Sequence, residues 1–304
     1  MLKKNLVKMP EWQALQNHYQ EMTRLTLRDL FDRDRNRVER FSLREDDIYL
    51  DYSKNLINTR TMDLLLKLAV ARNLKVEIEN MFGGQKVNQS EDRAALHIAL
   101  RNLNGSPVTL NGSDVMPGVR STLEKMKILS RSVREGRWRG FSNKRINHIV
   151  YIGIGGSNLG PRMVVGALEF YRRRNLSFHF VSNVDGSQIK ETLNKINPEK
   201  TLFIVASKNF KTEETMTNAG TAKQWILECF KSEKAVSNHF LAISSQRQRV
   251  VGFGIDPENI LDIWDWVGGR FSVSSAIGLP VMMAIGYRRF MEFLSGFHWM
   301  DTHF

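Results

Sequence analysis

The stretch INHIVYIGIGGSNLGP, residues 146–161, decides the fold class, because a short apolar run leads directly into a glycine-rich loop. Three further apolar runs of strand length follow it: LSFHFVSN (176–183), TLFIVASK (201–208) and FLAISS (240–245). Segments with helical spacing of apolar residues lie at 161–174, 213–230 and 274–294. This alternation predicts an α/β fold with a doubly wound parallel sheet.

The residues ahead of this stretch follow another pattern. Their apolar positions recur at helical spacing, as in LLLKLAVARNL (64–74) and EDRAALHIALRNL (91–103). Ser90 stands where it could cap a helix that begins at Glu91. We therefore expect the front of the chain to be mostly helical.

The two patterns predict an organisation in three parts. A helical region is expected over 1–120, a sheet domain over 121–294 and the start of a connecting segment over 295–304. Pro280 is expected to kink the helix predicted over 274–294, because proline cannot donate a backbone hydrogen bond.

Composition excludes several classes of protein. Of 304 residues, 42% are hydrophobic and 25% are charged, which is ordinary for a folded domain. No apolar run approaches the roughly 20 residues of a membrane-spanning helix, so we expect a cytoplasmic protein without a membrane partner. The single cysteine, Cys229, cannot form an internal disulfide, and its apolar surroundings predict a buried, unreactive thiol.

The formal net charge of +12 favours an anionic partner. Nucleic acid and phosphorylated metabolites are the two classes to consider. The basic runs, such as 33–40 and 130–140, include acidic residues or lie on helix faces, which is typical of solvated surfaces. No zinc-ligand spacing or helix-turn-helix signature accompanies them, so we expect no nucleic-acid partner and no metal.

Ligands of open parallel sheets bind beyond the carboxyl ends of the strands. The first such loop is GIGGSNLGP (153–161), where backbone amides near Gly156 could approach an anion and Ser157 offers a hydroxyl. Asn158 breaks the dinucleotide fingerprint, and Pro161 stands where a P-loop requires lysine. A tight turn without a ligand remains the alternative.

The loop SKNFKTEET (207–215) follows the third predicted strand. Its polar side chains ahead of the helix are Ser207, Lys208, Asn209, Lys211 and Thr212. Neutral donors and cations just before a helix suit a phosphate dianion. Capping of the helix by Thr212, with solvated lysines, is the alternative.

A third loop is DWVGGRFSVSSAIG (265–278). Gly268 and Gly269 free the backbone ahead of Arg270, which could meet a developing oxyanion. A surface ion pair of Arg270 is the alternative.

At these residues the chain resembles the phosphoglucose isomerases, over nearly its whole length. The resembling segments are YIGIGGSNLGP, VSNVDG (181–186), SKNFKTEET, DWVGGRFSVSSAIG, DYSKNLI (51–57), 81–102 and 296–304. The resemblance implies a sugar isomerase (SIS) fold, in which the helical region precedes the first of two SIS domains. It also implies a homodimer that interconverts glucose 6-phosphate and fructose 6-phosphate in glycolysis and gluconeogenesis without a metal or organic cofactor.

The resemblance assigns roles to individual residues. Gly156 and Ser157 would touch the sugar, and Arg270 would stabilise the enediolate. The phosphate cradle would consist of Ser207, Lys208, Asn209 and Thr212. In the family, one glutamate moves a proton between C2 and C1, as a base of suitable pKa can.

The chain also departs from the family pattern. Asn158 replaces an aspartate, and Asn209 and Lys211 replace threonines. The glutamate segment and the later histidine and lysine are not among these residues, and His97 and His298 are expected to be structural. We therefore expect a truncated isomerase that is inactive alone. The alternative is a phosphosugar-binding SIS module without catalysis.

Overall fold

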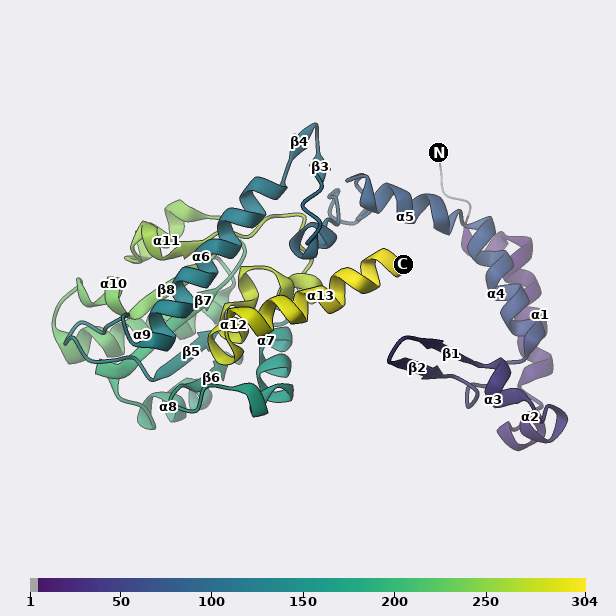
Figure 1. The fold of residues 1–304 in the computed structure, drawn as a ribbon, viewed down its shortest axis with the longest axis horizontal. Helices are drawn as coiled ribbons and strands as arrows, with labels where there is room; N and C mark the ends of the chain where they lie inside the picture. The colour runs from purple at the N-terminus through teal and green to yellow at the C-terminus, as the bar shows by residue number, and fades with distance from the viewer. Residues whose placement is uncertain (1–4) are drawn as a thin grey trace. The chain divides into compact units, whose positions relative to one another are not determined.

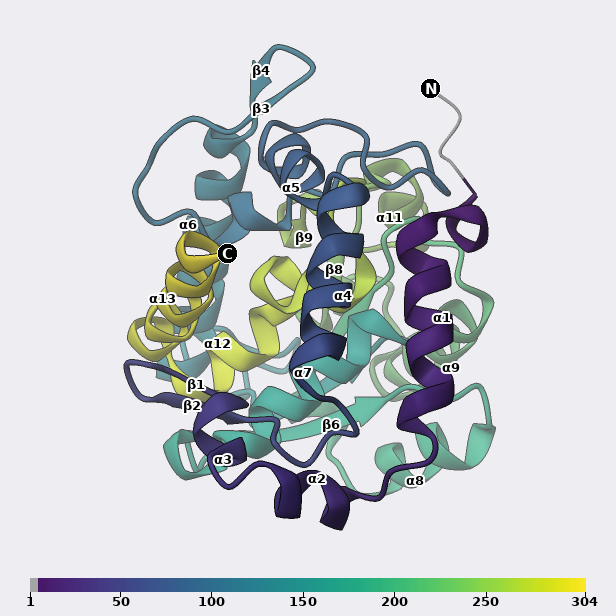
Figure 2. The same cartoon turned by 90° about the vertical axis from the view of Figure 1, so that its right-hand side faces the viewer.

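The computed structural model describes residues 5–304 and divides into two compact units, one ending at Glu79 and the other beginning at Asn80 (Figure 1). The elements of the first unit are the 3-10 helix η1 (Leu6–Lys8), the helices α1 (Pro10–Met22), α2 (Leu27–Arg33), α3 (Arg37–Arg40) and α4 (Thr59–Ala71), and the hairpin of β1 (Ser42–Glu45) and β2 (Ile48–Asp51). α5 (Leu74–Phe82) crosses the boundary. α1 and α4 lie side by side, with a 2.8 Å hydrogen bond between His18 Nε2 and Thr61 Oγ1 (Figure 2).

The second unit is built on a five-stranded sheet in the order β6-β5-β7-β8-β9, with every neighbouring pair parallel. The strands are β5 (His148–Ile152), β6 (Ser177–Val181), β7 (Thr201–Ala206), β8 (Phe240–Ile243) and β9 (Ile260–Leu261). The first four lie within the four predicted runs. The predicted α/β fold with a parallel sheet is therefore confirmed.

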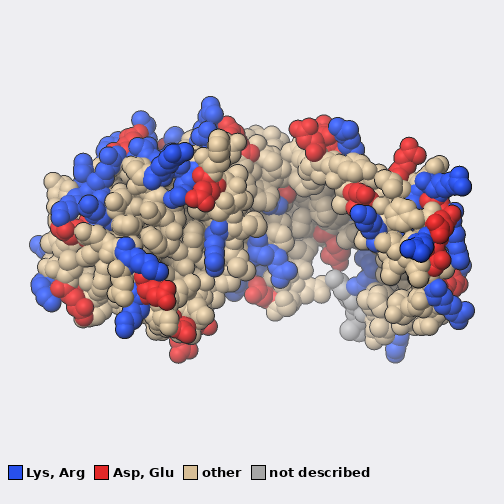
Figure 3. Space-filling model, turned by 90° about the horizontal axis from the view of Figure 1, so that it is seen from below, with Lys and Arg blue, Asp and Glu red and all other residues tan. Residues whose placement is uncertain are grey.

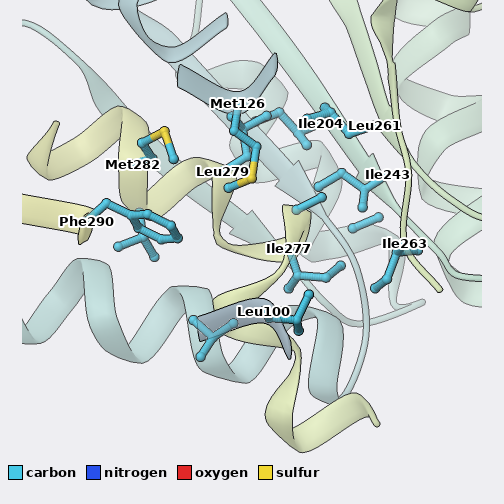
Figure 4. Packing of buried hydrophobic residues seen from close by; sticks show 14 of the residues in the cluster. Leu100, Met126, Ile204, Ile243, Leu261, Ile263, Ile277, Leu279, Met282 and Phe290 are labelled. Carbon is cyan, nitrogen blue, oxygen red and sulfur yellow. The ribbon is translucent and has the colours of Figure 1, made fainter. Parts of the chain in front are cut away.

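Helices cover both faces of this sheet, because neighbouring residues of a strand point to opposite sides. Ile149 and Tyr151 of β5 belong to one buried cluster, and Val150 and Ile152 belong to the other. The first cluster, part of which Figure 4 shows, includes residues of α6 (Met116–Glu135), α7 (Gly156–Ala167), α12 (Leu279–Ile285) and α13 (Tyr287–His303). The second includes residues of α8 (Gly186–Asn194), α9 (Glu213–Phe230), α10 (Ala235–His239) and α11 (Arg247–Phe253). The sheet is thus doubly wound.

Short elements complete the second unit. They are β3 (Thr109–Leu110), β4 (Ser113–Asp114) and the 3-10 helices η2 (His97–Arg101), η3 (Glu169–Tyr171), η4 (Pro198–Lys200), η5 (Pro257–Asn259), η6 (Gly269–Ser274) and η7 (Ala276–Gly278). Residue 120, near the expected domain division, lies within α6. The division into a helical region and a sheet domain stays a prediction.

The helix expected over 91–103 is wrong. The structure has only η2 there, and Asn88 and Arg93 instead form an antiparallel bridge. The backbone N–H of Leu96 donates to the carbonyl of Trp266 at 3.2 Å. A tertiary hydrogen bond has therefore replaced one that a helix would make within itself, and Ser90 caps no helix.

Two other local expectations are corrected. The helix expected over 274–294 breaks at Gly286, whose φ is +88°, and not at Pro280. Pro280 lies at the start of α12, where its missing N–H would have no partner in any case. Cys229 is exposed and not buried, because it lies on the outward face near the end of α9.

On the face drawn in Figure 3, basic and acidic side chains are interspersed over both units. No helix of residues 5–304 is long and apolar enough to cross a membrane.

Candidate functional site

A cavity of about 490 Å³ opens at the carboxyl ends of β5 and β7. Its lining residues are Glu91, Arg93, Ile154, Ser157, Ala206, Ser207, Lys208, Asn209, Thr212, Thr215, Ser245, Gln246 and Asp265. Five of the seven predicted site residues are among them, and they come from two separate strand-end loops. The structure therefore brings Ser157 together with Ser207, Lys208, Asn209 and Thr212.

The loop after β7 is held in a compact turn by its own side chains. The hydroxyl of Ser207 donates to Asn209 Oδ1 at 3.3 Å and lies 3.2 Å from Thr212 Oγ1. Phe210 adopts a positive φ of +49° and is buried, which turns the chain between the strand and α9. The backbone N–H of Ser207 donates to the carbonyl of Ile243 at 3.1 Å. The hydroxyl groups of Ser207 and Thr212 and the side-chain amide of Asn209 are therefore held in place by contacts with one another and with β8.

Lys208 reaches across to the segment that precedes η6. Its Nζ donates to the backbone carbonyl of Val267 at 2.9 Å and to that of Asp265 at 3.3 Å. Burial lowers the pKa of Lys208, nearby Arg93 lowers it further, and Asp265 and Glu91 oppose that effect. An anion in the cavity would favour the charged form of this half-buried ammonium.

The amino end of α9 lies at the cavity, which Thr212 and Thr215 line. The first N–H groups of a helix have no partner within the helix, and they carry the positive end of its dipole. Thr212 is the N-cap residue, but its side chain makes no capping hydrogen bond to the helix. The hydroxyl of Thr215, one turn in, is buried and has no hydrogen-bond partner among the described residues. A buried polar group without a partner indicates a site for a ligand or an ordered water.

The glycine loop after β5 packs against the third loop. A Cβ at Gly156 would lie 2.3 Å from the carbonyl carbon of Gly269, so only glycine permits this close approach. The hydroxyl of Ser272 donates to the carbonyl of Gly156 at 3.2 Å. Gly156 is therefore a packing contact beside the cavity and does not line it. Asn158 is buried, and its Oδ1 has no partner among the described residues.

Arg270 does not line the cavity. It is exposed, on the first turn of η6, and makes no hydrogen bond or ion pair with a residue of 5–304. The contact between Gly156 and Gly269 nevertheless holds its backbone next to the glycine loop. The ion pair considered as its alternative is absent from the described residues.

Several lining residues were missed by the sequence analysis. Ser245 and Gln246 follow β8, so the rule on strand ends could have found them. Glu91 and Arg93 come from the segment expected to be helical, and Arg93 Nη1 lies 3.8 Å from Asp265 Oδ1. No local pattern marks these two residues, because only the tertiary fold brings them to the sheet.

The second unit also buries His97, which stacks on Phe271 with ring centroids 4.3 Å apart. Burial lowers the pKa of His97 to about 4, and Arg101 contributes to the shift. Among residues 5–304, no three His, Cys, Asp or Glu side chains gather in a group that could hold a metal ion.

Three comparisons with known proteins identify the same family. Residues 51–304 match the family model described as phosphoglucose isomerase. The chain is 51% identical over 299 residues to glucose-6-phosphate isomerase 1 of Chromobacterium violaceum, covering 98% of this chain and 55% of that protein. It is 49% identical over 296 residues to the glucose-6-phosphate isomerase of Methylococcus capsulatus, covering 97% of this chain and 54% of that protein.

A solved structure agrees with these matches. The glucose-6-phosphate isomerase of Chlamydia trachomatis superposes with a TM-score of 0.83 at 26% identity, covering 99% of this chain and 56% of that one. The chain thus spans about half the length of the relatives it matches. With the family model covering most of its residues, the chain belongs to the phosphoglucose isomerase family.

Proposed function

We propose that the cavity beyond β5 and β7 binds a phosphosugar. The phosphate would lie at the amino end of α9, within reach of Ser207, Lys208, Asn209 and Thr212, and the sugar would extend toward the loop of Gly156 and Ser157. The main support for the proposal is the cavity itself, which is lined by residues of two predicted loops. Thr215 also lines it, and the hydroxyl of Thr215 has no hydrogen-bond partner among the described residues.

The reaction proposed for this site is the interconversion of glucose 6-phosphate and fructose 6-phosphate in glycolysis and gluconeogenesis. It requires a base to carry a proton between C2 and C1, and a positive group to stabilise the enediolate. Arg270 is proposed for the second role, since its exposed side chain is free to turn toward a bound substrate. The base would be the family's glutamate, whose segment is not among these residues.

We therefore propose that the 304-residue chain binds substrate but does not turn it over by itself. Glu91 and Asp265 also line the cavity, but both carboxylates are exposed and face the cations Lys208 and Arg93. Both carboxylates therefore have cations beside them, and neither is proposed as the base. Dimerisation and a cytoplasmic location stay predictions.

The experiment separates binding from turnover. The purified chain is titrated with fructose 6-phosphate in a thermal-shift assay, beside Ser207→Ala and Arg270→Ala, and is then assayed for isomerisation in a coupled assay. We expect stabilisation of the parent chain, a reduced effect in Ser207→Ala and no turnover above background. Absence of any stabilisation would refute the binding site, whereas clear turnover would refute only the proposed inactivity.

The second candidate is a phosphosugar-binding module without catalysis. It is favoured by the fact that every residue lining the cavity belongs to one compact unit. The two candidates predict different turnover when the chain is mixed with the carboxyl-terminal part of the Chromobacterium violaceum relative. Restored turnover would support the isomerase, and binding that persists without turnover would support the module.

A further inference from the structure

A separate basic cavity of about 270 Å³ lies beside α6. Its lining residues are Lys127, Ser130, Arg131, Arg134, Glu135, Arg173 and Tyr287. None of them lines the cavity at the carboxyl ends of the strands. The proposed sugar phosphate therefore does not account for this second concentration of positive charge.

Both the spacing of basic residues along α6 and the tertiary fold bring the lining residues of this second cavity together. Lys127, Arg131 and Arg134 are separated by four and three residues, so they share one face of α6. Arg173 is placed against this face by its backbone N–H, which donates to the carbonyl of Ala284 at 3.0 Å. Tyr287, the first residue of α13, closes another side.

Positive charge in this cavity exceeds the negative charge available to it. Glu135 is the one carboxylate among the lining residues, against four cations. It already pairs with Arg131 at 2.8 Å and, outside the cavity, with Arg137 at 2.8 Å. Burial lowers the pKa of Arg134, and the charges of Arg173 and Arg289 lower it further. These groups therefore repel one another, and an anion would relieve that repulsion.

Two of these cations already have carboxylate partners. Lys127 pairs with Glu124 at 2.9 Å, and Arg131 pairs with Glu135. Arg134 Nη1 donates to the carbonyls of Met283 at 2.7 Å and Ala284 at 2.8 Å, which caps the carboxyl end of α12. Arg173 donates through Nε to the neutral Asn175 Oδ1 at 2.9 Å, and its two terminal nitrogens donate to no residue that the structure describes. The two terminal guanidinium nitrogens of Arg173, its fork, are thus available to donate to an external acceptor.

We propose that this cavity binds the phosphate group of a small anion, held by the guanidinium groups of Arg131 and Arg173 with Lys127 nearby. A guanidinium fork matches the geometry of phosphate oxygens, and charge-assisted hydrogen bonds of this kind are strong. The ligand is a free inorganic phosphate or the phosphate ester of a small metabolite, and the volume admits either. The site is independent of the function proposed above.

The test is a calorimetric titration in the Ser207→Ala background, which weakens binding at the first cavity. Inorganic phosphate and glycerol 3-phosphate are the two probes, at one fixed ionic strength, and they distinguish a free phosphate from an ester. The double variant Arg131→Gln with Arg173→Gln is compared with Arg24→Gln and Arg28→Gln, two exposed arginines of the first unit. Both double variants remove the same charge.

We expect the cavity variant to lower the affinity for the better probe at least tenfold, and the control variant to change it less than twofold. Arg173→Lys, which keeps the charge and loses the fork, should show an intermediate loss. If both double variants lost the same affinity, the effect would come from the total charge of the protein and not from this cavity, and the proposal would be overturned. Failure of both probes to bind would also overturn the proposal.

Discussion

The side-chain oxygens of Ser207 and Thr212 lie 3.2 Å apart, which joins the residue after β7 to the N-cap residue of α9. This contact sets the distance between the strand end and the helix end. Both residues line the same cavity, as does Thr215 in the first turn of α9. The phosphate site is proposed to form at this junction.

Thr212→Val is expected to weaken binding of fructose 6-phosphate about tenfold, because one hydrogen bond to a charged group contributes about 1.5 kcal/mol. The affinity is measured by calorimetry on the 304-residue chain. Thr221→Val, on the exposed face of the same helix, is the matched control and should leave the affinity unchanged. Equal affinity of Thr212→Val and the parent chain would remove Thr212 from the site.

Thr215→Val is expected to affect folding and binding in opposite directions. The buried hydroxyl of Thr215 has no partner in the ligand-free structure, so its removal should raise the free energy of unfolding by about 1 kcal/mol. The same change should weaken phosphosugar binding, since Thr215 lines the cavity. Urea denaturation and calorimetry measure the two effects, with the exposed Thr217→Val as control. A stability loss in Thr215→Val would contradict the assignment.

Gly156→Ala should destabilise the second unit by about 1–3 kcal/mol, because the new methyl group would overlap the backbone of Gly269. Gly166→Ala, in the same helix, meets no atom within 4 Å and should be neutral or stabilising by up to about 1 kcal/mol. Thermal unfolding of both variants tests the contrast. Similar melting temperatures would mean that the glycine loop and the third loop do not pack as described.

The pH dependence of stability should include a contribution from His97. Its folded-state pKa is about 4, below the ordinary value of 6.5, so below pH 6.5 the unfolded state binds the proton more readily than the folded state. Stability is therefore lost as the pH falls from 6.5 toward 4, by up to about 3 kcal/mol at 1.36 kcal/mol per pH unit.

The measurement compares urea unfolding of the parent chain with that of His97→Gln between pH 7 and pH 4. Subtracting the two curves removes the contributions of the other buried histidines, including His239, whose pKa burial also lowers. The difference between the two proteins should shrink as the pH falls. A difference that stays constant across this range would show that His97 does not titrate there.

The sequence alone predicted the parallel sheet and five of the thirteen residues that line the candidate cavity. Four strands were found because buried parallel strands are short, continuous apolar runs, and all four lie where the runs predicted. Ser207, Lys208 and Thr212 were found because the carboxyl ends of such strands meet at one edge. In both cases the information lies within about ten consecutive residues. α8, α11 and β9 are among the local elements that were missed, although Asp185 caps α8 through a 2.8 Å hydrogen bond from the N–H of Ser187.

The tertiary structure decided what depends on distant segments. Residues 91–103 have helical spacing, but a hydrogen bond from Leu96 to Trp266 holds that backbone outside a helix and brings Arg93 to the cavity. Gly156 was predicted to touch the sugar, yet its packing on Gly269 became visible only when two loops more than a hundred residues apart were placed together. Hydrogen bonds and close contacts between remote segments outweigh local propensity, because each contributes as much free energy as several residues of helical preference.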